Sequence, residues 1–355
     1  MQDILNLIGG ELRPAIGGGW LDDREPATGR VFARHPDSDA RDVQAAGGAA
    51  KAARPAGPAR GSEGRSRAMI GLADLIERQA DRFAEAESRD NGKPVRLART
   101  VDIPRAVSNL RFFATAILHL RTDAHVMDDV AVNYTERGPI GVVGCISPWN
   151  LPLYLFTWKI APALATGNAV VAKPSEVTPL TAFLMSALCA EAGFPPGALN
   201  TVHGLGPKVG AAIAAHPAIA AISFTGGTRT GQEIARVAAP MFKKLSLELG
   251  GKNPVLVFAD CDFEDMLATT VRSSFTNQGQ ICLCGSRILI ERSIYPKFKD
   301  AFVERVKALR VGDPGDPRSD LGAVVSESHM EKVLGHITLA KEEGGTVLCG
   351  GERVR

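Results

Sequence analysis

The sequence predicts an α/β protein whose main sheet is parallel and covered by helices, followed by a second, smaller α/β unit. Between Gly138 and Gly251, short apolar runs of strand length alternate with stretches of helical periodicity. A strand, crossover, strand order at this spacing favours parallel pairing, and parallel sheets are covered on both faces. Ligands of such sheets bind beyond the carboxyl ends of the strands, so we expect the chemistry in the loops there.

The first part of the chain contains one clear helical pattern. Residues 67–88 carry apolar side chains at three- and four-residue spacing, with Arg and Glu between them, which predicts an amphipathic helix. The preceding Ala53–Arg67 is rich in Arg, Pro and Gly and is predicted to be an irregular connection. Alternation around Val130–Tyr134 predicts a hairpin within Val126–Arg137, outside the main sheet.

The main sheet and the second unit follow in order. The predicted strands of the main sheet are Ile140–Ile146, Ala169–Ala172, Leu199–Val202, Ala221–Phe224 and Lys244–Leu249. The predicted helices between them are Leu180–Ala192, Lys208–Ala214 and a segment that starts near Thr230. The second unit begins near Asn253, with a buried-strand pattern at Pro254–Phe258, a helix at Phe263–Phe275, a strand at Arg287–Ile290 and a basic amphipathic helix at 295–310.

Composition excludes several classes of partner. The chain has 41 basic and 39 acidic residues, so no large basic field indicates nucleic acid or an anionic membrane. It shows neither a secretory signal nor an apolar run long enough to span a membrane. The six scattered cysteines do not form a disulfide scaffold, and reduced thiols in a cytoplasmic enzyme fit better.

The segment Phe275–Arg287 contains a candidate nucleophile, Cys282, just after a glycine-containing turn. A thiolate is the reactive form, and partial exposure in a polar loop is what it needs. A small buried hydrophobe is the alternative for any single cysteine. Cys284 makes a C-x-C pair with it, but no second ligand pair accompanies the two, so we expect no metal.

Glu248 is the second candidate, because it lies in an otherwise apolar strand that ends at Gly250–Gly251. Burying a carboxylate is expensive unless it is paired or held neutral, and a raised pKa would suit a general base that takes a proton from a thiol or a water. We therefore expect Glu248 to be buried, with the two glycines allowing another chain segment or a ligand to approach closely.

Further candidates follow the other strands. The Asn150 amide could stabilise a developing oxyanion. Lys173 can bond ribose hydroxyls, and Glu176 favours a free 2′-hydroxyl over a 2′-phosphate, which predicts NAD rather than NADP. The loop Phe224–Gly231 opens a helix whose amides suit a pyrophosphate, although each glycine loop alone is more often a plain turn.

Taken together, these segments resemble the aldehyde dehydrogenase superfamily over nearly the whole chain. The resemblance implies a Rossmann-like cofactor domain at residues 1–120 and 140–250, a bridging hairpin at 121–139 and a catalytic domain at 251–355. It implies that Cys282 attacks the aldehyde, Asn150 holds the oxyanion and Glu248 activates the hydrolytic water. The cofactor positions then fall on Ile146, Ser147, Pro148, Trp149, Lys173, Glu176, Gly206, Gly210, Phe224, Gly226, Gly227 and Leu249.

A finer resemblance is to the 2-aminomuconic and 2-hydroxymuconic semialdehyde dehydrogenase branch. It rests on Glu87–Phe113, on the ISPWNLPLYLFTWKIAP run and on RSSFTNQGQICLCGSR. In that branch the arginine of DIPR, here Arg105, is taken to bind the distal carboxylate of the substrate, a contact that suits a guanidinium. An arginine paired on a helix surface is the alternative.

The chain departs from the family pattern at its end. It stops at Arg355, before the family's later E-x-F-G-P segment, so we expect a C-terminally truncated form with weak activity or none. The full-length form is expected to be a homodimer or homotetramer. Two other hypotheses remain: a CoA-acylating semialdehyde dehydrogenase, which Glu248 disfavours, and an inactive nucleotide-binding fragment.

Overall fold

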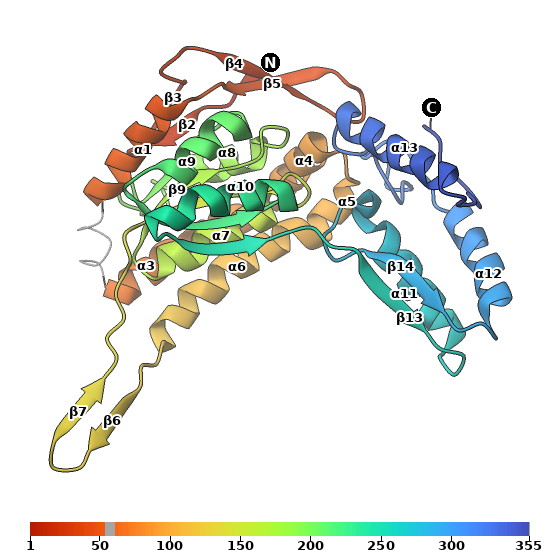
Figure 1. Ribbon diagram of the computed structural model, residues 1–355. Coiled ribbons are helices and arrows are strands. Elements are labelled where there is room, and N and C mark those ends of the chain that lie inside the picture. Colours follow the sequence, from red (N-terminus) through yellow and green to blue (C-terminus); the bar gives the residue numbers. More distant parts are fainter. Residues whose placement is uncertain (54–60, 355) are drawn as a thin grey trace.

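The computed structural model describes residues 1–53 and 61–354, and it confirms the α/β prediction (Figure 1). Its main sheet has seven strands in the order β12-β11-β8-β9-β10-β2-β3. The five parallel strands are β8 (Val142–Ile146), β9 (Ala169–Lys173), β10 (Leu199–Thr201), β11 (Ile219–Thr225) and β12 (Lys244–Glu248). Two short antiparallel strands, β2 (Asn6–Ile8) and β3 (Glu11–Arg13), extend the sheet beyond β10.

Helices cover both faces of this sheet. Successive residues of a strand point to opposite faces, so the side chains of one strand divide between two apolar clusters. Val143 and Cys145 of β8 join one apolar cluster, whereas Val142 and Ile146 join the other. The first cluster contains residues of α3 (Gly61–Arg78), α4 (Ala80–Asn91), α6 (Ile103–Ala116), α7 (Pro152–Ala165) and α8 (Leu180–Ala187). The second contains residues of α1 (Ala40–Ala53), α9 (Ala211–Ala215) and α10 (Thr228–Ala238).

Two small β elements lie outside the main sheet. A three-stranded sheet of β1 (Gln2–Asp3), β5 (Val31–Pro36) and β4 (Trp20–Arg24) was not predicted from the sequence. The hairpin of β6 (Ala124–Met127) and β7 (Ala131–Tyr134) confirms the hairpin prediction, and it projects away from the rest of the molecule (Figure 1). The shorter helical elements are α5 (Val95–Leu97), η1 (Ala98–Asp102), η2 (Ile117–His119), η3 (Gly206–Gly210), η4 (Ala239–Met241) and η5 (Thr276–Gly279).

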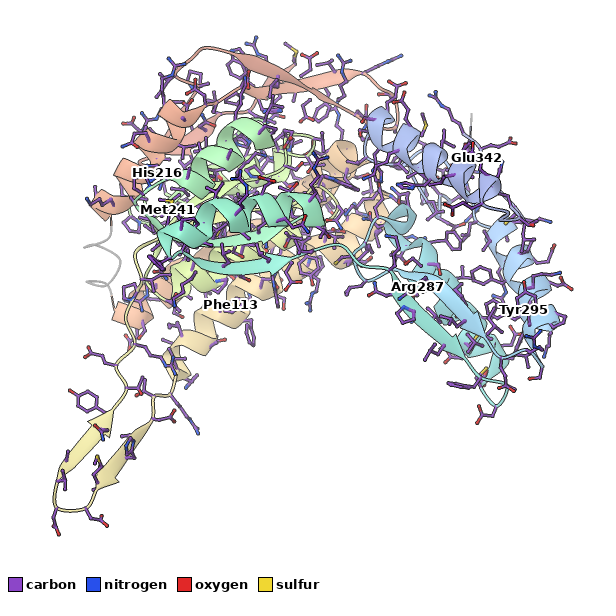
Figure 2. The ribbon with its side chains drawn as sticks, viewed as in Figure 1. Phe113, His216, Met241, Arg287, Tyr295 and Glu342 are labelled. Atoms are coloured by element: carbon purple, nitrogen blue, oxygen red, sulfur yellow. The ribbon has the colours of Figure 1, made fainter. Side chains whose placement is uncertain are left out.

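Residues 253–354, which we call the C-terminal unit, form a smaller layer. Strands β13 (Asn253–Val257) and β14 (Gly285–Ile290) pair in parallel and pack with α11 (Phe263–Phe275) and α12 (Tyr295–Lys307). The last helix, α13 (Glu327–Glu342), lies apart from these two strands (Figure 1). Figure 2 marks this unit by Arg287, Tyr295 and Glu342. The buried-strand prediction for Pro254–Phe258 is wrong, since Leu256 and Phe258 are each 61% exposed. A sheet of two strands has no further layer to cover them.

The predicted connection Ala53–Arg67 is also wrong where the structure describes it. Ala53 ends α1, and residues 61–67 are the first turns of α3; residues 54–60 lie outside the described part. Arg65 anchors this helix start by donating to the Ala165 carbonyl, 2.8 Å away, and Ser66 is already buried. The helix predicted at 67–88 is two helices, because the backbone of Gln79 leaves helical geometry between α3 and α4.

The remaining helices differ from prediction mainly at their ends. The helix predicted at Leu180–Ala192 ends at Ala187 and continues as turns, and α10 begins at Thr228. The helix predicted at Lys208–Ala214 is a wide π-turn, η3, that runs directly into α9. Within the described residues, no helix combines the length and apolar character needed to cross a bilayer.

Candidate active site

The five parallel strands end at one edge of the main sheet, and the loops after them carry most of the predicted site residues. Backbone hydrogen bonds hold these ends together. The Ser147 amide, after β8, donates to the carbonyl of Lys173 at the end of β9 over 3.0 Å. The Gly226 amide, after β11, donates to the carbonyl of Glu248 at the end of β12, also over 3.0 Å. The sheet therefore brings four of the predicted segments to one place.

The loop before Cys282 has an unusual backbone. Asn277, Gln278 and Gly279 take positive φ values of 56°, 57° and 73° in succession. Non-glycine residues adopt this left-handed region at a cost, and only where the surroundings hold them there. The surroundings do so here, since the Gln278 side chain donates to the Ala323 carbonyl over 2.7 Å. The Cys282 side chain is exposed, as expected for a reactive thiol.

Asn150 forms hydrogen bonds directly with this loop. Its side-chain amide donates to the backbone carbonyl of Gln280, 2.8 Å away and two residues before Cys282. In return, the Asn277 side chain donates to the Asn150 carbonyl over 2.9 Å. The predicted oxyanion donor and the predicted nucleophile loop, 130 residues apart in sequence, are thus fastened to each other by two hydrogen bonds.

A buried ion pair that the sequence prediction missed supports the loop that carries Asn150. Lys93 donates to the Asn150 carbonyl over 3.1 Å and pairs with Asp102 at 2.7 Å, and both charged side chains are 0% exposed. Asn91 also holds the loop, donating to the Trp149 carbonyl over 2.8 Å. The available signal was the lysine of Asp90–Pro94, which follows Gly92 a few residues after the end of the predicted helix.

Pro148 and Trp149 are half-buried members of the same loop. The Trp149 ring lies 4.8 Å from the His329 ring, centroid to centroid. His329 belongs to α13, so this helix of the C-terminal unit lies against the loop after β8. No sequence pattern indicated this contact.

The expected burial of Glu248 is wrong, because its side chain is exposed. Within the part of the chain that the structure describes, strand β12 is an edge strand that pairs only with β11, so its outer side lacks a neighbouring strand. The segment after Glu248 nevertheless lies near the nucleophile loop, since a Cβ built on Gly251 would lie 3.9 Å from the Cys282 carbonyl oxygen. That distance is an ordinary van der Waals contact, and a Cβ on Gly250 would meet no atom within 4 Å, so the approach seen here does not require glycine.

Lys159 is a second charged residue that sequence reasoning missed. It lies on α7, 3% exposed, with its ammonium 3.5 Å from the Ser223 hydroxyl of β11. Burial lowers the pKa of Lys159 to about 8, while Cys145 and Glu248 act in the opposite direction. A lysine near neutrality can accept or release a proton, and here it interacts electrostatically with the candidate base.

The buried Lys173 and the half-buried Glu176 form an ion pair after β9. The ammonium lies 2.8 Å from Glu176 Oε2, and the Gly206 amide donates to Oε1 over 3.3 Å. Burial alone would raise the pKa of Glu176, but the Lys173 ammonium outweighs it and the pKa is lowered. A Cβ built on Gly210 would lie 3.9 Å from Lys173 and 4.0 Å from Ile146, so these predicted positions are neighbours.

The loop after β11 leads into α10. No side chain caps the first amides of this helix, which leaves them available to an anion. Gly227 faces open space, whereas a Cβ on Gly226 would meet the Phe224 ring at 2.5 Å. The Gly226 amide is already committed to Glu248, so this glycine contributes space rather than a donor. Leu249 packs against Gly231 on the inner side of α10.

Arg105 lies on the exposed side of α6, beside α7. Its guanidinium donates to the Tyr154 hydroxyl over 3.2 Å and lies 5.2 Å from the centre of that ring. Trp158 packs edge-on against Tyr154, and Phe113, labelled in Figure 2, packs against Trp158. Within the described residues Arg105 has no carboxylate partner, whereas Arg111 on the same helix binds both Asp74 and Glu77. The surface ion pair that was the alternative for Arg105 is therefore not formed.

Comparison with known proteins identifies this arrangement. The family model described as the aldehyde dehydrogenase family matches residues 17–355. A 2-aminomuconic semialdehyde dehydrogenase of Danio rerio is 54% identical over 97% of this chain and 71% of its own length. A 2-hydroxymuconic semialdehyde dehydrogenase of a Pseudomonas strain is 45% identical over 99% of this chain and 74% of its own length.

Solved structures agree with the sequence relatives. An NAD⁺ complex of an aldehyde dehydrogenase from Bacillus cereus superposes with a TM-score of 0.98, at 39% identity, over 100% of this chain and 72% of that one. Among residues 1–53 and 61–354, no group of three or more His, Cys, Asp or Glu side chains is placed to hold a metal ion. The chain belongs to the aldehyde dehydrogenase family.

Proposed function

We propose that this chain carries the NAD-dependent oxidation of an aldehyde to a carboxylate, with Cys282 as nucleophile, Asn150 as oxyanion donor and Glu248 as base. The observation that supports it most is the hydrogen bond from the Asn150 amide to the Gln280 carbonyl, which places a neutral donor at the loop of an exposed cysteine. Members of this family oxidise aldehydes with NAD.

The residues present fit NAD. The Glu176 carboxylate is available to a free ribose 2′-hydroxyl and would repel a 2′-phosphate. The uncapped amides at the start of α10 suit the pyrophosphate, and Gly227 leaves the space it needs. When bound, NAD supplies the acceptor for the hydride that leaves the substrate.

The chain's own residues account for the other steps. The Cys282 thiolate adds to the aldehyde carbon, and the oxygen takes the charge that the Asn150 amide and the Cys282 amide then stabilise. Loss of hydride leaves a thioester on Cys282. Glu248 takes a proton from water, which attacks the thioester, releases the carboxylate and returns the thiol. The buried Lys159 interacts electrostatically with Glu248.

We propose a carboxylated semialdehyde of the 2-aminomuconate or 2-hydroxymuconate type as substrate. Arg105 supports this proposal, since it is exposed, has no carboxylate partner within the described residues and is oriented by the Tyr154 hydroxyl. A guanidinium in that state is ready for a bidentate contact with the distal carboxylate. The related enzymes named above carry these substrates in their names.

The activity is tested by NADH absorbance with an aldehyde panel, with and without CoA. We expect oxidation that does not require CoA, and its loss by at least about a thousandfold in Cys282→Ala, because the covalent route is removed. Cys284→Ala, two residues away and buried, is the matched control. A strict CoA requirement would favour the acylating alternative, and a chain that binds NAD without turnover would favour the inactive fragment.

The substrate is tested by comparing Arg105→Ala with Arg111→Ala on the same helix. We expect Arg105→Ala to raise KM for a carboxylated semialdehyde about tenfold or more while leaving that for a plain aliphatic aldehyde nearly unchanged. Arg111 is committed to Asp74 and Glu77, so its loss should affect both substrates equally. Equal effects from Arg105→Ala would assign it a structural role.

We also propose a cytoplasmic homodimer or homotetramer. The projecting hairpin supports assembly, since Val126, Val130, Val132 and Tyr134 are all more than 60% exposed on it. Exposed apolar side chains on a projecting edge favour burial against another chain. Sedimentation of the wild type beside Val130→Lys tests this, with a shift toward monomer as the expected result.

A further inference from the structure

The segment Glu87–Lys93, which we call the support segment, spans the end of α4 and the turn that follows it. Glu87, Asn91 and Lys93 are each 0% exposed. Burying charged and amide side chains is expensive unless they find partners inside the protein. The resemblance to the semialdehyde branch draws on this segment, yet none of the catalytic steps proposed above uses it.

Two side chains of the support segment bind carbonyls of Trp149–Leu153, which we call the oxyanion loop. The Asn91 side-chain amide donates to the Trp149 carbonyl over 2.8 Å, and the Lys93 ammonium donates to the Asn150 carbonyl over 3.1 Å. The Asn91 side-chain oxygen has no partner within the described residues. An apolar side chain of similar size would fill that place without an unpaired oxygen, so the amide donor is the feature that this position uses.

Glu87 holds the other end of the oxyanion loop, where α7 begins. Its carboxylate accepts from the Leu153 amide over 3.1 Å and from the Thr181 hydroxyl over 2.6 Å. Amides in the first turn of a helix have no partner within the helix, and the N-cap residue of α7, Leu151, supplies no side-chain acceptor. Glu87 therefore fixes the direction in which the chain leaves Asn150.

The Asn150 carbonyl joins the support segment to the nucleophile loop. It accepts from Lys93 over 3.1 Å and from the Asn277 side chain over 2.9 Å, so both lone pairs of the carbonyl oxygen are used. The Asn150 side chain in turn donates to the Gln280 carbonyl over 2.8 Å. A rotation of the Asn150 peptide would move its side chain away from the nucleophile loop, and these bonds oppose that rotation.

We propose, on the basis of the function proposed above, that the support segment positions the Asn150 amide for the oxyanion that forms on the Cys282 adduct. Its three side chains are fully buried, so they act through the backbone of the oxyanion loop rather than on the aldehyde. They are therefore positioning residues. Displacement of a catalytic donor by a small distance costs a large factor in rate, so loss of one of these bonds should slow the chemistry more than it weakens binding.

The first test measures pre-steady-state NADH formation by the full chain with saturating NAD and a plain aldehyde. NADH formed in the first turnover reports the steps at the oxyanion, before hydrolysis. We expect Asn91→Leu and Glu87→Leu to lower the first-turnover rate about tenfold to a hundredfold. The aldehyde concentration at half-maximal rate and the Kd for NAD should change less than about threefold. Glu87→Gln keeps an acceptor for the Leu153 amide and should restore the rate to within about threefold of the wild type.

Asn200→Leu is the matched control for Asn91→Leu. Asn200 is also 0% exposed, and its side-chain amide donates to the carbonyls of Val170 and Gly197, outside the oxyanion loop. This variant should lower the urea midpoint yet keep the first-turnover rate within about twofold of the wild type. If Asn200→Leu slowed the reaction as much as Asn91→Leu, loss of any buried hydrogen bond would have the same effect, and the positioning role would be refuted.

Lys93 is tested together with its ion-pair partner, because Lys93→Met alone leaves the Asp102 carboxylate buried and unpaired. The double variant Lys93→Met/Asp102→Leu replaces the whole pair by apolar side chains, a change that often leaves stability nearly unaltered. We expect its urea midpoint to recover toward that of the wild type, while its first-turnover rate stays at least about tenfold low, since the Asn150 carbonyl still lacks its donor. A rate that recovers together with stability would assign the pair a merely structural role.

The first-turnover measurement separates failure of the positioning role from failure of the proposed function. A wild-type chain that binds NAD but forms no NADH would refute the proposed function and the positioning role with it. NADH formation that is as fast in Asn91→Leu and Glu87→Leu as in the wild type would refute the positioning role alone.

Discussion

The main sheet with its helices and the C-terminal unit differ in which side chains they bury and which they expose. The main-sheet region buries charged groups completely, including Lys93, Asp102 and Asp90. The C-terminal unit leaves apolar side chains such as Leu256 and Phe258 exposed. Its apolar cluster, within residues 253–354, has only Val257, Leu267 and Phe298 as buried members.

The difference follows from the number of layers. A sheet of seven strands with helices on both faces removes its centre from water, so even a charge there must find a partner within the protein. A two-stranded sheet buries little on its own. We infer that the main-sheet region supplies most of the stability, and that the C-terminal unit depends on its contacts with the loop around Asn150.

The largest expected effect concerns the buried pair of Lys93 and Asp102. Lys93→Met leaves the Asp102 carboxylate without its partner and should lower the free energy of unfolding by about 3–5 kcal/mol, measured by urea denaturation. Arg305→Met is the counterpart in the C-terminal unit, where Arg305 and Glu264 are 52% and 72% exposed. That pair should contribute no more than about 1 kcal/mol. Equal losses of unfolding free energy in Lys93→Met and Arg305→Met would contradict the difference between the two regions.

The next prediction concerns pH. Burial raises the pKa of Asp23 to about 7, and burial with the neighbouring Asp23 raises that of Asp90. A raised carboxyl pKa means that the folded state keeps a proton that the unfolded state loses. The stability from this pair is therefore full below about pH 4 and falls as the pH rises toward 7.

Asp23→Asn should remove the part of that dependence that comes from Asp23 and should reduce the part from Asp90, whose own burial remains. The unfolding free energy of the wild type should fall relative to Asp23→Asn by up to about 4 kcal/mol between pH 4 and pH 7. Asp22→Asn, an exposed neighbour whose side chain is 54% accessible, should leave the profile unchanged. Parallel profiles for the wild type and Asp23→Asn would refute the shared burial of the two carboxyls.

Two leucines provide the direct test of packing. Leu153 on α7 is 0% exposed, and Leu256 on β13 is 61% exposed. Leu153→Ala should destabilise the protein by about 2–5 kcal/mol, whereas Leu256→Ala should cost less than about 0.5 kcal/mol. A large cost at Leu256 would show that this surface is covered in solution.

The smallest expected effect is at the start of α11. The Asp262 side chain accepts from the Asp265 amide over 3.0 Å and caps this helix. Asp262→Ala should cost about 1 kcal/mol, while Asp262→Asn, which keeps an acceptor, should cost a few tenths. Thermal unfolding by circular dichroism measures both. If the two variants behaved alike, the cap would not contribute to the C-terminal unit.

Much of the fold could be predicted because its main signals are local. Apolar runs mark the central strands, and the hairpin shows its alternation around Val130–Tyr134. The N-terminal sheet was missed because its strands have only two to six residues and mixed burial. The burial of Glu248 was predicted wrongly because a strand's place at the edge of a sheet depends on pairing between distant segments.

The site residues also fall into those that a local sequence pattern predicts and those that depend on distant segments. The motif residues Cys282 and Asn150 were found from their own segments, and the structure brings their loops together. Lys93 and Lys159 were missed, since their contacts with the Asn150 carbonyl and the Ser223 hydroxyl join segments 57 and 64 residues apart in sequence. Lys159 lies within α7, and a single lysine in a helix-forming segment carries no local sign that it will be buried.

The reciprocal bonds between Asn150 and the nucleophile loop have a mechanical consequence. Asn150 donates to Gln280 and accepts from Asn277, so the two units cannot separate at this point without breaking both bonds at once. Any opening of the C-terminal unit would then occur as one concerted event rather than as gradual loosening. Amide hydrogen exchange would report it as a group of residues on both sides of the junction that open together, with one common protection factor.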